Sequence, residues 1–457
     1  MSDDDGRERQ SGSRKPLVLR GFRDYLPAQM ILRQRITGIF QGIFERHGFE
    51  PLDTPALEYL SILTGKAGEN EKLMYHFADQ GGREVGLRYD LTVPLARVVA
   101  MHQNELVLPF KRYHIAPVWR AEKPQRGRFR EFWQCDADVA GSASMLADAD
   151  VVAIMAEALT AVGLPNFTIL INHRRLLEGL ALVAGVPEQE AGTIYRAVDK
   201  LAKIGRDGVA RELREAGVPD DAIARVLDPV TMSGPPRDVL AELRPRLAGL
   251  PGAETAIAEL EQLFALLPDF GVPPDRYRLD LALARGLDYY TGPVYEATVT
   301  EPNVGSVAGA GRYDALIGTF LGRPVPATGI SLGLERIIEV VEEFGLLPVP
   351  VTVPQVFVAL FPDTVGEGAR LASRLRTEGL RVDLSLNPQR GLGDQLKYAS
   401  RKGIPIAVIA GAAELAEAAA AVRDMRSGEQ HTVALDELGG YIAELLAPGG
   451  TAQDATR

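Results

Sequence analysis

The spacing of apolar residues divides the first part of the chain into helical and extended stretches. Apolar positions recur every three or four residues over 28–48 and over 143–162, which predicts two helices, the first ending at Gly48. Alternation of apolar and polar positions predicts strands instead. These strands are expected at 85–89, 111–120, 128–138 and 167–172. The second and third strands can pair as a hairpin around the polar loop between them.

The pattern changes twice in the second half of the chain. From Arg174 to about Leu266, Ala, Leu, Glu and Arg dominate and strand patterns are scarce, which predicts a helical insertion within a sheet-based domain. The pair Pro235–Pro236 breaks this insertion once. Strands return at 277–300 and near 305–308, and a helix carrying GLERIIEVVEEFG follows them.

The last hundred or so residues have the pattern of a separate domain. Three prolines in ten residues at 345–354 predict a linker. Beyond it, strand and helix patterns alternate, which predicts a compact α/β domain. The expected order is QVFVALF, a helix at 364–378, LRVDLSL, a helix at 391–402 and IPIAVIAG.

Composition is typical of a soluble globular protein. Hydrophobic residues make up 46% and charged residues 24% of the 457 positions, and no apolar run reaches the roughly 18 residues of a membrane helix. Residues 1–15 are polar and lack an apolar core, so we expect a disordered tail and no secretory signal. Cys135 is the single cysteine, which excludes an intrachain disulfide and a cysteine-rich zinc site. The expected compartment is the cytoplasm.

Charge is unevenly distributed along the chain. The net charge of −11 argues against a general nucleic-acid binder. Residues 111–130, however, carry seven positive charges and only Glu122 as a negative one, a balance of +6. The positive residues are Lys111, Arg112, Arg120, Lys123, Arg126, Arg128 and Arg130. A solvated surface explains such a run, but the aromatic residues that interrupt it favour a binding face.

Familiar nucleotide and metal motifs are missing. There is no G-x-x-x-x-G-K-[ST] and no HExxH, and Gly309-Ala310-Gly311 lacks the third glycine of a dinucleotide fingerprint. The segment VWRAEKPQRGRFREFWQCDADVAG at 118–141 instead places an arginine, a basic loop and a strand in succession.

One face of that strand alternates aromatic and polar residues. The face consists of Phe132, Gln134, Asp136 and Asp138. An arginine fork suits a phosphate, an aromatic ring suits a purine, and Gln134 and Asp138, roughly 13 Å apart along the strand, suit a small polar ligand between them. An exposed sheet face with cross-strand ion pairs fits the same pattern equally well.

The segment 118–141 also resembles motif 2 of the class II aminoacyl-tRNA synthetases. ARGLDYYTGPVYEA at 284–297 resembles the signature peptide of histidyl-tRNA synthetases, and GISLGLERII at 329–338 resembles motif 3. LRYDLTVP at 87–94 and GFRDYLP at 21–27 are similar to the amino-group segment and to the start of motif 1. RVDLSL, DQLKYASRKGIP and VRDMRSGEQ within 381–430 are similar to the anticodon-binding domain of that family. The likeness covers about residues 18–446 and preserves the order of the motifs.

The resemblance implies an α/β (α+β) fold with a class II antiparallel-sheet catalytic domain, a helical insertion and a C-terminal α/β anticodon-binding domain. The implied boundaries are a tail at 1–15, a catalytic domain at 16–173 and 267–344, an insertion at 174–266, a linker at 345–354, an anticodon-binding domain at 355–446 and a flexible tail at 447–457. Motif 1 builds the dimer interface in that class, so the resemblance also implies a homodimer.

The resemblance places histidine in a defined set of side chains. Asp90 and Thr92 would hold its α-amino group, with Gln134 near the amino and carboxylate end. Asp138 and Tyr290 would bond the imidazole nitrogens, and Tyr289 would shape the pocket. A carboxylate and a phenol can satisfy both nitrogens of an imidazole, which supports discrimination without editing.

ATP would bind beside this pocket. Arg120 would contact the α-phosphate and the histidine carboxylate, Glu122 and Phe132 the adenine, and Arg336 the terminal phosphates. Arg285 would lie across from Arg120, and these two arginines would stabilise charge as the carboxylate attacks phosphorus. Mg²⁺ is expected mainly through ATP, and no protein ligand to a metal is assigned.

For tRNA(His), the resemblance assigns contact with the acceptor stem to the loop from Lys123 to Arg128. Gln125, Arg126 and Arg128 are the candidates within this loop. In the C-terminal domain, five basic residues outnumber two acidic ones over 381–402, which fits either an anticodon-stem face or a solvated helix.

Taken together, the resemblance implies an ATP-dependent ligase that makes histidyl-adenylate and transfers histidine to the 3′ end of tRNA(His). The alternative is the non-catalytic, histidine-binding regulatory subunit of ATP phosphoribosyltransferase, which resembles these synthetases but usually lacks the anticodon domain and the motif arginines. Taken singly, Asp90 and Asp138 also fit cap or surface carboxylates, the Tyr289–Tyr290 pair fits sheet packing, and Arg336 fits a helix surface. Ala310 departs from the family pattern, because a glycine is usual at this position of the family's GGRYD segment, where this chain has AGRYD at 310–314.

Overall fold

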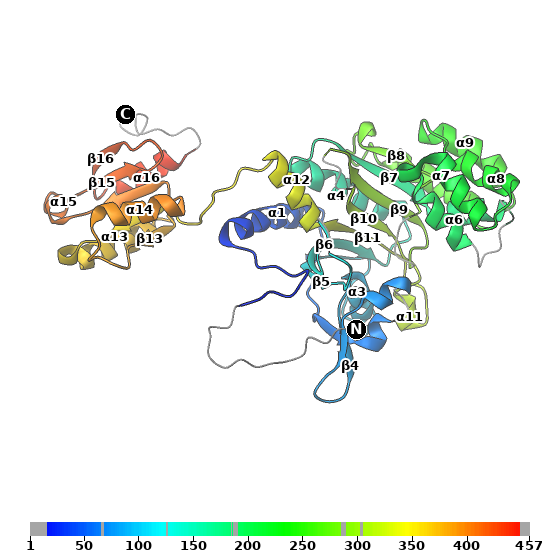
Figure 1. Cartoon of the computed structure of the whole chain (residues 1–457), viewed down its shortest axis with the longest axis horizontal. Coiled ribbons are helices and arrows are strands. Elements are labelled where there is room, and N and C mark those ends of the chain that lie inside the picture. The colour runs from blue at the N-terminus through cyan, green and yellow to red at the C-terminus, as the bar shows by residue number, and fades with distance from the viewer. Residues whose placement is uncertain are drawn as a thin grey trace, which may run out of the picture. The chain divides into compact units, whose positions relative to one another are not determined.

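The computed structural model describes residues 16–64, 68–124, 127–183, 185, 191–284, 289–301 and 305–447. Two compact units divide the chain (Figure 1). One contains the residues up to Asp24 together with Arg35–Leu347, and the other contains Tyr25–Gln34 and the residues from Pro348 onward. Within the described residues, no helix has both the length and the apolar character needed to cross a membrane.

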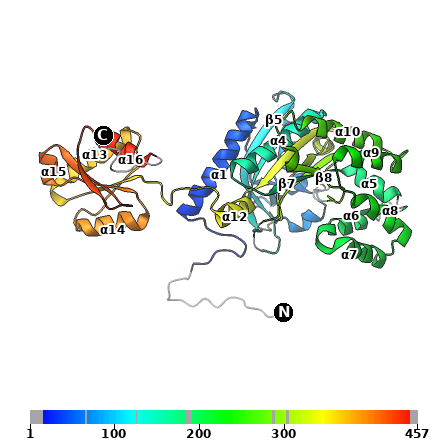
Figure 2. The same cartoon turned by 90° about the horizontal axis from the view of Figure 1, so that it is seen from above.

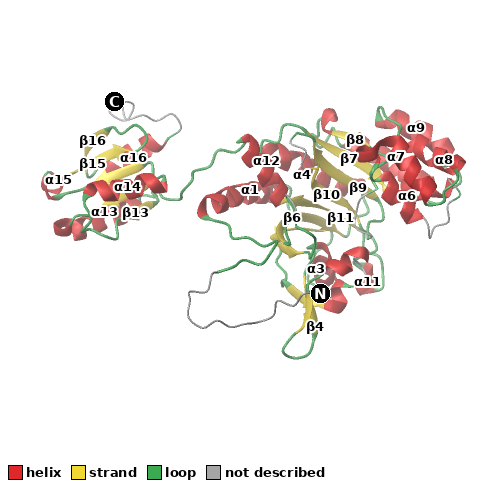
Figure 3. Cartoon of the chain, in the orientation of Figure 1, coloured by secondary structure: helices red, strands yellow, loops and turns green. Residues whose placement is uncertain are grey.

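The first unit is built on a large, mostly antiparallel sheet, drawn in yellow in Figure 3. Its spatial order is β1 (Glu50–Pro51), β5 (Phe110–Trp119), β6 (Glu131–Ala140), β11 (Ala327–Gly333), β10 (Gly305–Arg312), β9 (Pro293–Val299), β7 (Phe167–His173) and β8 (Tyr277–Leu279). Only the β1–β5 and β7–β8 pairs are parallel. At the centre of the sheet, the hairpin β5–β6 lies beside β11, β10 and β9, which follow the helical insertion in the sequence.

The hairpin β5–β6 follows the predicted alternation. Trp119 pairs with Glu131 at the loop end, and Arg112 pairs with Asp138 further along. Residues two apart on a strand share a face, so Gln134, Asp136 and Asp138 lie on one face of β6, while Cys135 is fully buried among the apolar residues of the other.

α4 (Met145–Ala161) and α12 (Leu334–Phe344) are two of the helices that pack on this sheet within the first unit. α4 contacts five strands of the sheet, and α12 contacts β6, β10 and β11. α4 is apolar nearly all round its circumference, as expected of a helix covered on several sides. α1 (Pro27–Arg46) ends near β5, where the rings of Phe44 and Tyr113 lie 5.7 Å apart.

A smaller antiparallel sheet lies between α1 and β5 in the sequence. Its order is β2 (Leu57–Tyr59), β4 (Glu84–Leu87) and β3 (His76–Ala78). The neighbouring helical elements are α2 (Leu60–Leu63), η1 (Gly68–Leu73), α3 (Thr92–Met101) and, from later in the chain, α11 (Gly318–Leu321). The sequence analysis predicted the strand near β4 but neither its partners nor α3, which begins two residues after Asp90.

The described part of residues 174–266 is mostly helical, and Figure 2 shows these helices gathered beside β7 and β8. They are α5 (Arg174–Val183), α6 (Ala191–Val198), α7 (Leu201–Glu215), α8 (Asp220–Val230), α9 (Pro236–Arg246) and α10 (Ala253–Leu266), and η3 (Pro274–Arg276) leads back to the sheet. The predicted break at Pro235–Pro236 coincides with the start of α9, because proline suits the first turn of a helix.

The second unit has its own sheet. The order is β13 (Val382–Leu384), β12 (Val356–Ala359), β14 (Ile406–Ile409), β15 (Ala419–Asp424) and β16 (Gln430–Ala434). The pairs β13–β12 and β12–β14 are parallel, and the pairs β14–β15 and β15–β16 are antiparallel. Its helical elements are η4 (Pro362–Thr364), α13 (Val365–Thr377), α14 (Leu392–Lys402), α15 (Ala412–Ala416) and α16 (Leu438–Leu446). Val356 and Val358 enter one apolar core and Phe357 and Ala359 another, which explains the unbroken apolar run in β12.

Candidate functional site

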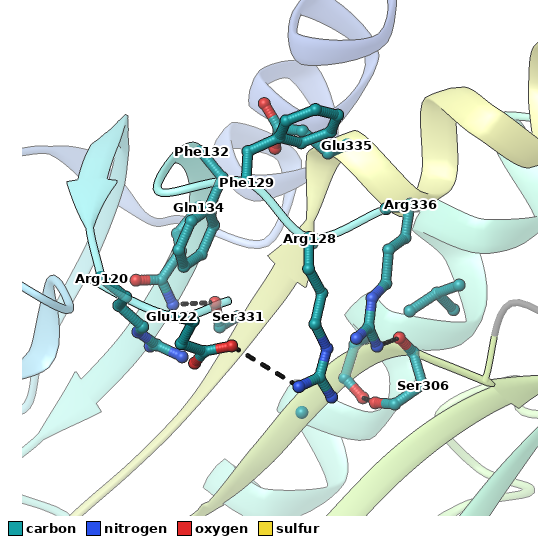
Figure 4. Close-up of a pocket in the computed structure, with 15 residues that line it drawn as sticks. Arg120, Glu122, Arg128, Phe129, Phe132, Gln134, Ser306, Ser331, Glu335 and Arg336 are labelled. Atoms are coloured by element: carbon teal, nitrogen blue, oxygen red, sulfur yellow. Dashed lines mark hydrogen bonds and ion pairs between the residues drawn. The ribbon is translucent and has the colours of Figure 1, made fainter. Parts of the chain in front are cut away.

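A cavity of about 260 Å³ opens above the large sheet, between the β5–β6 loop, β10, β11 and the start of α12. Figure 4 shows charged side chains from the end of β5 and the following loop and from the start of α12 beside this cavity. Its charged and polar walls include Arg120, Glu122, Arg128, Gln134, Ser306, Ser331, Glu335 and Arg336, and Phe129 and Phe132 supply aromatic surface. Such a lining suits a ligand that carries both negative charge and a flat ring.

Arg120 follows β5 directly and is held on two sides. Its Nε donates a hydrogen bond of 2.9 Å to the carbonyl oxygen of Tyr89, and its guanidinium lies 5.1 Å from the centre of the Phe132 ring. The first contact ties the arginine to the LRYD segment, and the second is a cation–π arrangement. Arg120 is thereby pre-positioned beside an aromatic wall.

The other two arginines of the cavity come from the loop and from α12. Arg336, in the first turn of α12, donates from Nη1 to the carbonyl oxygen of Ser306 in β10. Arg128 Nη1 lies 3.5 Å from a carboxylate oxygen of Glu122, and both side chains are partly exposed, so this contact is weak. In Figure 4, Arg120 and Arg336 stand on opposite sides of the cavity with Arg128 between them.

Gln134 lines the same cavity from β6. Its side-chain nitrogen donates a hydrogen bond of 2.6 Å to the hydroxyl of Ser331 on the neighbouring strand β11. Its side-chain oxygen is buried without a hydrogen-bond partner among the described residues. A buried acceptor of this kind costs free energy unless a donor reaches it, which suits a bound ammonium or amide group.

A second cavity of about 270 Å³ adjoins the first. Both cavities share Arg120, Arg128, Ser306, Gly309, Ser331 and Arg336 as walls. The second cavity continues to Tyr290, Tyr295 and Glu296, and Ala310 also lines it. The two form a continuous site with a cationic end and a tyrosine-lined end.

Three buried carboxylates stand near the tyrosine-lined end. Burial raises the pKa of Asp90 to about 6, although its Oδ1 accepts the amide hydrogen of Val93 at 3.0 Å. Burial likewise raises the pKa of Asp136 to about 8 and that of Asp138 above its usual range, and Arg112 opposes both shifts. Asp90 thus caps the start of α3 through one oxygen, which leaves the other for a different partner.

Tyr289 and Tyr290 pack against each other at the same end of the site. Their rings lie 5.2 Å apart in an edge-to-face arrangement, and the Tyr289 ring lies 5.7 Å from that of Tyr313. The Tyr289 hydroxyl lies 3.5 Å from Asp90 Oδ2 and also interacts with Thr92. Burial raises the pKa of both tyrosines, so they remain phenols at neutral pH.

The structure therefore brings together most of the residues singled out by the sequence. Arg120, Glu122, Phe132, Gln134 and Arg336 line the first cavity, and Arg128, expected at the tRNA, lines it too. Tyr290 lines the second, Asp90, Asp138 and Tyr289 lie near Tyr290, and Thr92 lies beside Tyr289. Arg285, Gln125 and Arg126 lie outside the described residues.

Several residues of the site were missed by the sequence analysis. Ser306 and Ser331 carry no charge, and their place depends on the strand order β6–β11–β10, which the pattern could not supply. Arg112 was counted only as part of a basic run, yet its side chain is fully buried and 3.0 Å from Asp138. Tyr313 donates a hydrogen bond to Asp138 and lies in the GRYD segment, which was inspected only for its glycine.

The raised pKa of Asp136 predicts a specific pH dependence of stability. A carboxyl whose pKa is raised to about 8 in the folded chain keeps a proton that the unfolded chain releases above about pH 4. Its contribution to stability is therefore complete below about pH 4 and is lost as the pH rises toward 8. We expect Asp136→Asn to gain stability relative to the natural chain between pH 5 and 8, by at most about 1.4 kcal/mol per pH unit.

Thermal unfolding of both proteins at pH 5, 6.5 and 8 measures this difference. Parallel pH profiles of the two proteins would show that Asp136 is ionised in the folded chain, contrary to its burial.

With this geometry, the similarities to known proteins become informative. Residues 21–337 match the family model of histidyl-tRNA synthetase, and residues 355–445 match that of an anticodon binding domain. The histidine–tRNA ligase of Aeropyrum pernix is 44% identical over 442 residues, which cover 94% of this chain and 99% of the relative.

Solved structures agree with these matches. The histidyl-tRNA synthetase of Nostoc is 35% identical, with a TM-score of 0.84 and coverage of 96% of this chain and 100% of the other. An ATP phosphoribosyltransferase regulatory subunit/histidyl-tRNA synthetase from Bacillus halodurans is 25% identical, with a TM-score of 0.70 and coverage of 84% and 97%. The predicted fold class is confirmed by the family matches and by the Nostoc structure.

Proposed function

Because this chain belongs to the histidyl-tRNA synthetase family, we propose that it joins histidine to tRNA(His) in two steps at the paired cavities of the first unit. In the first step, a carboxylate oxygen of histidine attacks the α-phosphorus of ATP, and pyrophosphate leaves. In the second step, a hydroxyl at the 3′ end of tRNA(His) attacks the carbonyl carbon of histidyl-adenylate, and AMP leaves. The observation that carries the proposal is the meeting of Arg120, Arg128 and Arg336 around one cavity that opens toward buried carboxylates and tyrosines.

The cationic cavity is proposed to bind ATP. Arg120 would contact the α-phosphate, Arg336 the terminal phosphates, and Phe132 and Glu122 the adenine. Since Arg128 lines the same cavity, it would also lie close to the phosphates, in addition to the role at the tRNA that the sequence indicated. Fixed guanidinium groups stabilise the charge that develops as pyrophosphate leaves, without reorganisation of solvent.

Mg²⁺ would accompany ATP and help to neutralise its phosphates. The described residues contain no group of three or more His, Cys, Asp or Glu side chains that could hold a metal ion. Magnesium commonly binds with nucleotide substrates chiefly through phosphate oxygens, and we propose the same for this site.

The tyrosine-lined cavity is proposed to bind histidine. The second carboxylate oxygen of Asp90, Thr92 and the unpartnered oxygen of Gln134 would receive the α-amino group. Asp138 and Tyr290 would bond the imidazole, and Tyr289 would pack beside it. Arg285 is proposed to face Arg120 across the reacting carboxylate, on the strength of the signature peptide in which it lies.

The regulatory subunit of ATP phosphoribosyltransferase was the alternative function. The match of residues 355–445 to an anticodon binding domain and the near-complete coverage of histidine–tRNA ligases favour the ligase. We propose the domain boundaries given above, a cytoplasmic location and a homodimer as further family properties.

ATP–pyrophosphate exchange, measured with each of the twenty amino acids and with or without total tRNA, tests the proposed function. Exchange that depends on histidine alone, and charging of tRNA(His) alone, are the expected results. Absence of histidine-dependent exchange in the purified chain would exclude the ligase.

Binding of tRNA is expected to depend on salt through the β5–β6 loop. Lys123 is exposed in this loop and does not line the ATP cavity. We expect Lys123→Ala to weaken tRNA binding severalfold and to reduce the slope of log K against log salt concentration by about 1. Pyrophosphate exchange without tRNA provides the control and should not change. An unaltered salt slope would place the acceptor stem elsewhere.

A further inference from the structure

Arg112 is a buried cation beside the proposed histidine site, without a role in the function so far described. It lies on β5, its side chain is 0% exposed, and it pairs across the hairpin with Asp138. Its Nη2 lies 3.0 Å from Asp138 Oδ2 and donates a hydrogen bond of 2.9 Å to the carbonyl oxygen of Leu91. The second contact anchors the guanidinium to the backbone just before α3, so its position is fixed independently of Asp138.

The spaces that Asp138 and Tyr290 occupy exist because two paired residues lack side chains. Gly329 on β11 pairs with Asp138 on one side and with Gly311 of β10 on the other. A Cβ atom at Gly329 would lie 2.0 Å from Asp138 Oδ1, and one at Gly311 would lie 2.8 Å from the ring of Tyr290. The Asp138 carboxylate and the Tyr290 ring, the two groups proposed to bond the imidazole, thus lie directly over glycine positions.

The charged and titratable groups around Asp138 come from five elements. On β5 these are Arg112 and His114, on β6 Asp136, before α3 Asp90, and at the ends of β9 and β10 the phenols Tyr290 and Tyr313. His114 has a pKa lowered to about 4 by burial and by neighbouring arginines, so it is neutral at pH 7. Asp136, with a pKa near 8, is largely protonated. Arg112 is therefore the cation in direct contact with Asp138, and it opposes the effect of burial on that carboxyl.

We propose that Arg112 is a positioning residue for amino-acid recognition, whose guanidinium fixes the Asp138 carboxylate over Gly329 in its ionised form as the acceptor for an imidazole N–H. This inference rests on the proposed binding of histidine at this end of the site. It assigns recognition of the side chain to a pair, Arg112 and Asp138, and makes the neutral imidazole the preferred form of the substrate, because the pair has no net charge to offer an imidazolium.

Kinetics of Arg112→Met test the proposal. We expect the KM for histidine in pyrophosphate exchange to rise about 10- to 100-fold at pH 7, because the imidazole N–H loses its charge-assisted hydrogen bond to Asp138. The KM for ATP and kcat should change about twofold or less. Arg112→Lys keeps the charge and should lose less. Without the arginine, Asp138 is protonated to a higher pH, so the ratio of variant to natural KM should fall between pH 6.5 and 8.5. Titration of free histidine cancels in this ratio.

Gly329→Ala supplies a second test that keeps the arginine. The added methyl displaces the carboxylate, so the KM for histidine should rise with no recovery at high pH. Thermal unfolding establishes whether each variant is folded. If Arg112→Met does not fold, Gly329→Ala provides the deciding test.

The possible outcomes separate the inference from the function on which it rests. Absence of histidine-dependent exchange in the natural chain would overturn both. If the natural chain shows exchange but Arg112→Met has an unchanged KM for histidine, the inference alone is overturned. If Arg112→Met does not fold, an unchanged KM for histidine in Gly329→Ala has the same consequence. A raised KM with the same ratio at every pH would overturn it as well, because Asp138 would then stay ionised without Arg112.

Discussion

Arg120→Ala is expected to lower histidine-dependent ATP–pyrophosphate exchange by about a thousandfold, the scale seen when a phosphate-stabilising arginine is lost. Arg120 lines both cavities and is held by the Tyr89 carbonyl and the Phe132 ring. It is therefore placed to contact the α-phosphate and the attacking carboxylate at once. Its loss removes positive charge where the negative charges of two substrates meet, so kcat should fall more than either KM rises.

A matched variant separates this effect from a general loss of arginine. Arg246 is an exposed residue of α9 that pairs with Glu242 on the same helix, far in sequence from either cavity. Exchange by Arg246→Ala should stay within about twofold of the natural rate, since exposed pairs of this kind contribute little. Exchange by folded Arg120→Ala at more than a tenth of the natural rate would contradict the assigned role.

The sequence predicted those parts of the first unit in which a short-range pattern decides the structure. The hairpin β5–β6 was expected because two alternating runs flank a polar loop, and α12 because its apolar residues recur at helical spacing. α3 was missed because Thr92 and Pro94 were interpreted as a binding segment, although proline is tolerated in the first turn of a helix. The pairing of β10 with β11, and hence the glycine pair Gly311–Gly329, depends on contacts between distant segments that no local pattern specifies.

The register of the hairpin explains why Arg112 was missed. A shift of one residue between two strands moves every side chain to the opposite face. The run of seven cations in 111–130 gave no means of deciding which arginine faces Asp138 and which faces solvent. In the structure, Arg112 pairs with Asp138 in the sheet, whereas Arg120 lies beyond the strand in the cavity and Arg128 is exposed. One charged stretch therefore supplies three different environments.

Asp90 shows that two interpretations of a residue need not exclude each other. The sequence allowed either a cap or a ligand for an amino group. One carboxylate oxygen caps α3 through the amide of Val93, and the other faces Tyr289 at 3.5 Å. Since the cap fixes the carboxylate, a ligand that approaches the second oxygen meets a preorganised acceptor.

Asp138→Ala is expected to raise the KM for histidine by at least about 100-fold and to destabilise the first unit by about 3–5 kcal/mol, because it removes one partner of a buried ion pair. The KM rises because the imidazole loses its charged acceptor, and stability falls because Arg112 remains buried beside a cavity without its carboxylate. Pyrophosphate exchange and thermal unfolding measure the two effects separately. Asp138→Asn keeps the shape and should raise the KM with a smaller loss of stability.

The double variant Arg112→Met/Asp138→Ala distinguishes an unpaired charge from a simple loss of packing. If the destabilisation comes from the stranded guanidinium, the double variant should be more stable than Asp138→Ala alone, since no buried charge remains. Its histidine KM should match that of Asp138→Ala, because Arg112 acts on the imidazole only through Asp138. Additive losses in both stability and KM would mean that the two residues act independently, and that Arg112 does not act on the imidazole through Asp138.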